Sequence, residues 1–172
     1  MRSLDWLKRL WRPRRDEATI PLYRAIVTRA RAEHWYVAGA VPDTVDGRFD
    51  AIAAVLSIVL MRLEQEPEGT APATALAEHF VDDMDAQLRQ IGFGDMVVGK
   101  QVGRMMAALG GRLGAYRDAF AGGSLEDALI RNLYRDEAPS ALAVEHVATE
   151  LRRLHGDLST RPIETLLNGE LP

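Results

Sequence analysis

The sequence predicts an all-α protein: a single compact bundle of about six to eight helices, with a short amphipathic helix at the N-terminus. Apolar residues recur at intervals of three and four through most of the chain, which is the period of helices that bury one face. Alternating runs of β-branched residues and hairpin turns between them, which would indicate strands, are missing. The 172 residues suit one domain, which we divide into an N-terminal segment, 1–15, and a helical domain, 19–172.

Residues 1–15 form a basic segment. Six basic side chains against one acidic one give it a net charge of +5, whereas the rest of the chain carries −9. On a helix that ends at Pro13, the apolar residues share one side and the basic residues lie opposite. Such a helix can lie in a membrane interface, and docking of its apolar side on the helical domain is the alternative. The predicted membrane-contact residues are Trp6, Leu7, Leu10 and Trp11.

The first two helices of the domain are predicted from apolar residues at helical spacing and from the glycine and proline residues that end each run. The first is predicted over about 19–35, with Thr19 as its expected cap. The second begins near Val45 and ends before Pro67. This second helix is apolar on both faces, which is typical of a helix at the centre of a bundle.

The remaining helices are less regular. A third is expected over 73–91 and a fourth from about Gly99 to Phe120. The fourth contains glycines that indicate close packing or a bend: Gly103, Gly110, Gly111 and Gly114. Ser124, with an acidic residue three positions later, resembles a capping box. A helix is therefore expected at 124–135. Two more are expected at 139–155 and 163–167.

Composition excludes several kinds of site. The chain has no cysteine, so disulfides, iron–sulfur ligation and cysteine nucleophiles are ruled out. No stretch reaches the roughly 18 apolar residues that cross a bilayer, and no secretory signal is present. The acidic domain, at a net −4 for the whole chain, does not favour nucleic acid. We expect a bacterial cytoplasmic protein.

Catalytic patterns are mostly missing. Nucleotide loops, nucleophile elbows and Glu-x-x-His pairs do not occur, so we expect no enzyme and no cofactor. Four side chains within little more than one helical turn leave a cryptic metal enzyme as an alternative: Glu78, His79, Asp82 and Asp83. The other histidines are isolated and expected on helix surfaces: His34, His146 and His155.

Two segments are distinctive. Residues 41–50 read VPDTVDGRFD and lead into the second helix, and residues 80–102 span the third helix and the start of the fourth. In order, spacing and helical context they resemble the ubiquinol–cytochrome c chaperone family, over about 22–134. The resemblance implies a non-enzymatic assembly factor that binds newly made cytochrome b and supports assembly of the bc1 complex.

The same resemblance sets the expected partners and place. It implies a role at the cytoplasmic face of the inner membrane, or in the mitochondrial matrix of a eukaryote. Three assembly states stay open: the protein alone, a homodimer, or a complex with a small second assembly subunit. An apolar groove between helices would bind the client, and methionines could give it an adaptable lining: Met61, Met84, Met96, Met105 and Met106. The alternative is a peripheral membrane module that carries a lipid or quinone in such a groove.

Residue roles follow from the two segments. Contact with the client is predicted for Phe93, Met96, Val97 and Lys100. A structural role is predicted for Asp43, Thr44, Gly47, Arg48, Phe49, Gly92, Gly94 and Asp95. Of these, Asp43 or Thr44 can cap the second helix, Arg48 can pair with Asp82 or Asp85, and the two later glycines can end the third helix.

Overall fold

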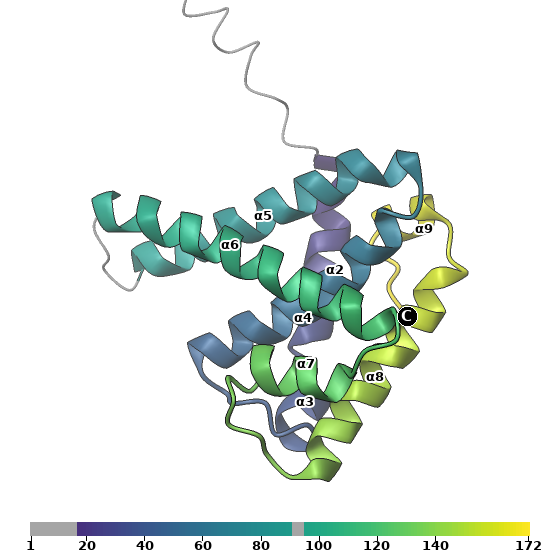
Figure 1. The fold of residues 1–172 in the computed structure, drawn as a ribbon. Helices are drawn as coiled ribbons and strands as arrows, with labels where there is room; N and C mark the ends of the chain where they lie inside the picture. The colour runs from purple at the N-terminus through teal and green to yellow at the C-terminus, as the bar shows by residue number, and fades with distance from the viewer. Residues whose placement is uncertain (1–16, 91–94) are drawn as a thin grey trace, which may run out of the picture.

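The protein is seen in a computed structural model that describes residues 17–90 and 95–172 (Figure 1). Within these ranges every regular element is helical, and the all-α prediction is confirmed. The predicted membrane-contact residues and the segment with Gly92, Phe93 and Gly94 lie outside the described ranges. No described helix is long and apolar enough to cross a membrane.

The helices follow one another with short connections. In chain order they are η1 (Glu17–Thr19), α2 (Ile20–Ala30), α3 (Glu33–Val37), α4 (Val45–Leu63), η2 (Pro67–Gly69), α5 (Thr70–Gln90), α6 (Asp95–Phe120), α7 (Leu125–Asn132), α8 (Ala141–Ser159) and α9 (Ile163–Leu167).

The single helix predicted over 19–35 is wrong in extent, because the chain turns between α2 and α3. Ala32 has an extended backbone, with φ −60° and ψ 137°. After this turn the Trp35 side chain is buried, and its indole Nε1 donates to the Arg29 carbonyl at 2.7 Å. The buried tryptophan thereby holds α3 against the end of α2.

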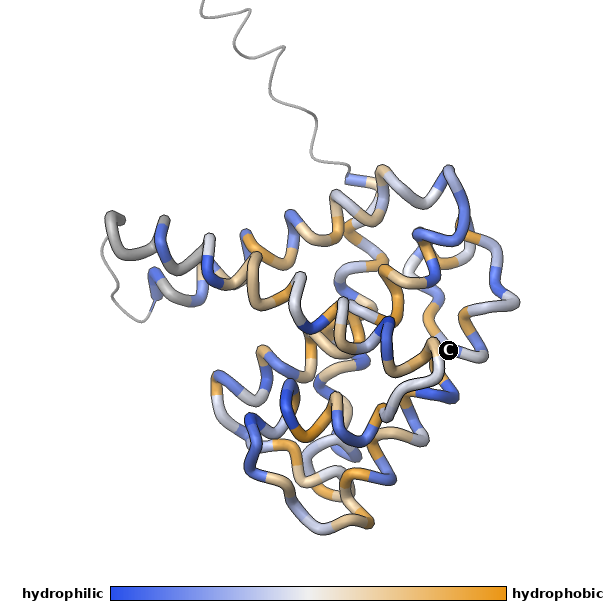
Figure 2. Tube along the Cα trace, in the orientation of Figure 1, coloured by the Kyte–Doolittle hydropathy of each residue, from blue (hydrophilic) through white to orange (hydrophobic). Residues whose placement is uncertain are grey.

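Helix α4 is the centre of the bundle, as its apolar sequence predicts. Every residue from 51 to 60 is buried, and α2, α5, α6 and α8 pack around it. Ser57, the polar exception in this run, donates its hydroxyl to the Ala53 carbonyl at 2.7 Å. Hydrophobic residues line the inner sides of the packed helices (Figure 2). The central helix therefore provides a common apolar surface for its neighbours.

The start of α4 is held by close local contacts. The Thr44 hydroxyl accepts a hydrogen bond from the Gly47 N–H at 3.0 Å, so the predicted cap is confirmed. A Cβ on Gly47 would lie 1.9 Å from the Pro42 carbonyl oxygen, so this position has room for glycine alone. Arg48 pairs with Asp43 at 2.7 Å. The predicted pairing of Arg48 with Asp82 or Asp85 across the bundle is therefore wrong.

Helices α5 and α6 pack against each other, and their distal ends form an arm that extends away from the body (Figure 1). Helix α6 begins at Asp95, earlier than predicted, and runs unbroken through its glycines. The prediction that these glycines serve close packing is wrong. A Cβ on Gly103, Gly110 or Gly114 would meet no atom within 4 Å, and Gly110 and Gly114 face an open pocket between α6 and α7.

The C-terminal helices close the bundle. The Ser124 hydroxyl accepts from the Asp127 N–H at 3.1 Å, which confirms the predicted cap of α7. Helix α8 packs against α4 and α7, and α9 packs against α2. The prediction for α7 is too long at its C-terminal end, because Arg135 and Asp136 both have positive φ, 52° and 66°, and leave the helical conformation.

Candidate functional site

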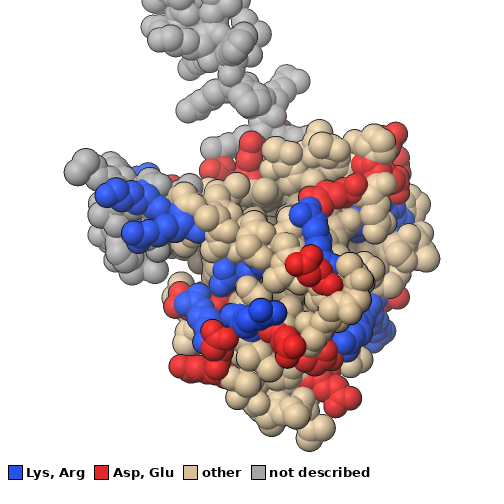
Figure 3. All heavy atoms as spheres, in the orientation of Figure 1, with Lys and Arg blue, Asp and Glu red and all other residues tan. Residues whose placement is uncertain are grey.

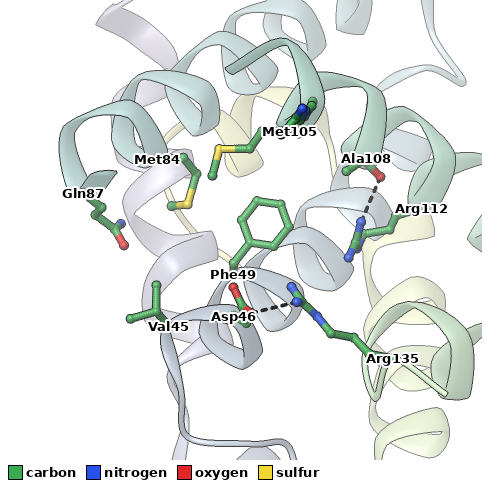
Figure 4. Close-up of a pocket in the computed structure, with 10 residues that line it drawn as sticks. Val45, Asp46, Phe49, Met84, Gln87, Met105, Ala108, Arg112 and Arg135 are labelled. Carbon is green, nitrogen blue, oxygen red and sulfur yellow. Dashed lines mark hydrogen bonds and ion pairs between the residues drawn. The ribbon is translucent and has the colours of Figure 1, made fainter. Parts of the chain in front are cut away.

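A cavity of about 370 Å³ opens where the start of α4 meets α5 and α6 (Figure 4). Its apolar lining consists of Val45, Phe49, Met84, Met105 and Ala108. Its polar lining consists of Asp46, Gln87, Arg104, Arg112 and Arg135. Each helix contributes one stripe of residues at helical spacing, so the cavity is built by three amphipathic faces that meet.

Phe49 forms the centre of the apolar lining. Its ring points between Met84 and Met105 (Figure 4) and lies 5.2 Å from the ring of Phe80, centroid to centroid. Met84 is buried, whereas Phe49 and Met105 are half-buried, so the apolar surface continues to the mouth of the cavity. Two unbranched methionine side chains beside an aromatic ring give a surface that can adapt to differently shaped apolar groups.

The predicted methionine lining is correct in part. Met84 and Met105 line the cavity, whereas Met61 packs against the core. Met106 is 42% exposed on α6 outside the cavity lining. The side chain of Met96 lies outside the described part of the structure. The helical period alone could not separate these positions, because a core methionine and a cavity methionine follow the same spacing.

An ion-pair network lies beside this apolar lining. The carboxylate of Asp50 on α4 has no exposed surface and accepts from the Arg112 Nη2 at 2.6 Å and from the Arg135 Nε at 2.7 Å. Burial raises the pKa of the Asp50 carboxyl, and the two guanidinium groups act in the opposite direction. The network joins α4 to α6 and to the turn after α7.

Both guanidinium groups of this network have further partners. Arg112 donates to the carbonyls of Ala108 and Asn132 at 3.2 and 3.3 Å, and its guanidinium carbon lies 5.4 Å from the centroid of the Phe49 ring. Arg135 pairs with Asp46 at 2.8 Å. The network therefore positions the walls of the cavity and leaves these two arginines with their charges balanced.

Among the residues predicted to contact the client, only the Lys100 side chain belongs to the described part of the structure. Lys100 is exposed on α6, one turn before Arg104 at the cavity. Met96 and Val97 belong to α6, but their side chains, like Phe93, are outside the described part. The four client contacts thus remain a prediction. The sequence reasoning missed Asp50, although a carboxylate at the start of an apolar helix is a signal, since it requires a buried partner.

The histidines and nearby carboxylates do not form the alternative metal site. His79 Nε2 lies 3.0 Å from the Thr19 hydroxyl, and Asp83 accepts from the Tyr23 hydroxyl at 2.8 Å. In residues 17–90 and 95–172, no three His, Cys, Asp or Glu side chains are arranged to hold a metal ion.

The prediction of isolated histidines is wrong for one pair. His34 on α3 and His146 on α8 are joined by a 3.0 Å contact between Nδ1 and Nε2, because helix packing brings together positions far apart in the chain. His155, the third of these histidines, stacks on the ring of Phe120 at 4.3 Å between centroids. Burial lowers the pKa of His34 and of His155.

Comparisons with known proteins place this architecture. The model of the ubiquinol-cytochrome C chaperone family matches residues 38–171. A solved structure described as the crystal structure of the Cbp3 homolog from Brucella abortus is similar at 28% sequence identity and a TM-score of 0.79, over 98% of this chain and 95% of that one. No curated protein sequence matches the chain. The chain therefore belongs to the ubiquinol-cytochrome C chaperone family.

Proposed function

We propose that this protein is a non-enzymatic assembly factor that binds newly made cytochrome b and supports assembly of the ubiquinol–cytochrome c reductase complex. Membership of the chaperone family supports the general role. The observation that carries the proposal in this chain is the cavity between α4, α5 and α6, because its apolar lining continues to an open mouth.

The chemistry of the cavity suits such a client. A membrane protein before assembly exposes apolar side chains, and an apolar cavity covers them without requiring matched hydrogen bonds. Phe49 and Met105 are half-buried in the lining, so a bound side chain would complete their burial. Burying one Leu- or Phe-sized side chain contributes about 1.5–3 kcal/mol, which corresponds to roughly tenfold to a hundredfold in affinity.

Membrane attachment is the second part of the proposal. Residues 1–15 carry a net charge of +5, and the helix predicted for them would have an apolar side that contains Trp6 and Trp11. We propose that this segment binds the anionic cytoplasmic face of the membrane, where the client is inserted. Removal of residues 1–15 should then weaken binding to anionic vesicles and reduce the amount of client recovered from membranes.

The test of client binding is recovery of cytochrome b with tagged protein from solubilised membranes of the native host. Met105→Asp places a charge in the cavity, and Leu142→Asp makes the same change on α8, where Leu142 is 78% exposed. We expect Met105→Asp to reduce recovery at least tenfold at an unchanged helical circular dichroism spectrum, and Leu142→Asp to leave it intact. Recovery of lipid or quinone without cytochrome b would contradict the proposal and support the carrier alternative.

A further inference from the structure

We propose that the cavity between α4, α5 and α6 binds a helical apolar segment of a partner polypeptide that carries one acidic side chain, and that Arg104 binds this carboxylate. The inference rests on the proposed function, because it describes the client segment that the cavity would accept. It adds the chemistry by which such a segment would be recognised.

The charge balance of the cavity carries the inference. Three arginines line it, against Asp46 in the lining and the buried Asp50 behind it, which leaves one positive charge without a partner. Arg112 and Arg135 supply the two charges that are paired. Arg104 supplies the third, since it is exposed and makes no hydrogen bond or ion pair with any residue in the described part of the chain.

The surroundings of Arg104 keep its charge available. Helix α6 has no acidic residue between positions 96 and 117, so no carboxylate on the same helix can neutralise it. Lys100 lies one turn earlier and is also exposed. Figure 3 shows basic side chains gathered on the arm formed by α5 and α6. An anionic group at the mouth of the cavity would therefore meet a positive field.

The shape of the site favours a polypeptide segment. At about 370 Å³ the cavity is near the lower end of the range for small-ligand sites, so it holds a few apolar side chains at a time. From the cavity, α6 continues toward its N-terminal end, where Lys100 and Gly103 are exposed. A helix laid along α6 can insert apolar side chains between Phe49 and Met105 while one carboxylate reaches Arg104, which is the helix-in-groove mode of recognition.

An apolar membrane segment that carries an acidic side chain needs a cationic partner before assembly. An acidic side chain within a membrane-spanning helix is costly while it has no partner, and before assembly its final partner is absent. A guanidinium at the edge of an apolar cavity offers a charge-assisted hydrogen bond to the acid while the cavity covers the neighbouring side chains. Arg104 thereby selects, among apolar segments, those that carry a carboxylate.

The test uses the full chain and three labelled peptides of about 18 residues, built from Leu and Ala with one central Glu, Gln or Lys. We expect fluorescence anisotropy to show the Glu peptide binding about tenfold more tightly than the Gln peptide, with the difference shrinking at high salt. Arg104→Glu should reverse the order in favour of the Lys peptide. Arg153→Glu, at a 70% exposed site on α8, is the matched control and should not.

Equal affinity for the Glu and Gln peptides, or an order that Arg104→Glu leaves unchanged, would overturn the inference. Binding of phosphatidylglycerol vesicles that depends on Arg104, with no binding of any peptide, would also overturn the inference and assign the site to lipid headgroups. The two proposals fail separately. Cytochrome b recovered with protein that does not discriminate the peptides would refute Arg104 recognition alone, whereas Arg104-dependent peptide binding without cytochrome b recovery would refute the identity of the client.

Discussion

Replacing Asp50 by Asn should destabilise the protein strongly, because this carboxylate joins three parts of the bundle from a buried position. Asn keeps the size and removes the charge. Its amide oxygen can accept from one guanidinium, but its NH2 group then faces the donors of the other. Arg112, of whose side chain only 14% is exposed, would keep a largely buried charge without a counterion.

The structure indicates how much free energy of unfolding Asp50→Asn should cost. Breaking a buried ion pair by removing one partner costs about 3–5 kcal/mol. Because half of the Arg135 side chain is exposed and can turn to water, we take the lower end, about 3 kcal/mol, a large part of the 5–15 kcal/mol typical of a domain. Asp43→Asn is the control. Its pair with Arg48 is more than half exposed on both sides and should contribute less than about 1 kcal/mol.

The assay is urea unfolding of both variants and the unchanged protein, followed by circular dichroism of the helices. Equal slopes of free energy against urea would show that the compared states are the same, so that the difference in midpoint measures stability. The reasoning is refuted if Asp50→Asn loses less than about 1 kcal/mol, or no more than Asp43→Asn does. Either outcome would mean that the buried carboxylate contributes no more than an exposed one.

Three further predictions are tested by the same urea unfolding assay and by thermal unfolding. Gly47→Ala should cost about 3 kcal/mol, because its Cβ would overlap the Pro42 carbonyl, and a loss near zero would refute this. Gly110→Ala should instead raise the free energy of unfolding by about 1 kcal/mol, because the new methyl group meets no atom within 4 Å and alanine favours a helix. A lower melting temperature would contradict this prediction. Burial lowers the pKa of His34, so the unfolded chain takes up its proton first and stability should fall as the pH drops below about 6.5. His34→Gln should flatten that decline, and an unchanged pH dependence would exclude the burial of His34 as its source.

Local sequence signals predicted well in several short segments that decide their own structure, although the Thr19 side chain, expected to cap the first helix, makes no capping hydrogen bond. Thr44 and Ser124 cap their helices as expected, since an N-cap depends on groups within three residues of it. The buried position of α4 also followed from its apolar run. The same signals failed for Arg48 and for the glycines of α6. Spacing shows which residues share a helix face, but not which neighbour that face meets.

The sequence by itself determined the all-α class, the order of the longer helices, the central place of α4 and the resemblance to a chaperone family, because these depend on period, caps and contiguous motifs. Tertiary structure alone decided the cavity and its charge. Asp46, Met84, Arg104 and Arg135 belong to four different parts of the chain, and only packing brings them together. Packing also decided that Asp50 neutralises two arginines and leaves Arg104 unpaired, since the balance of charge at a site depends on distances that no linear spacing contains.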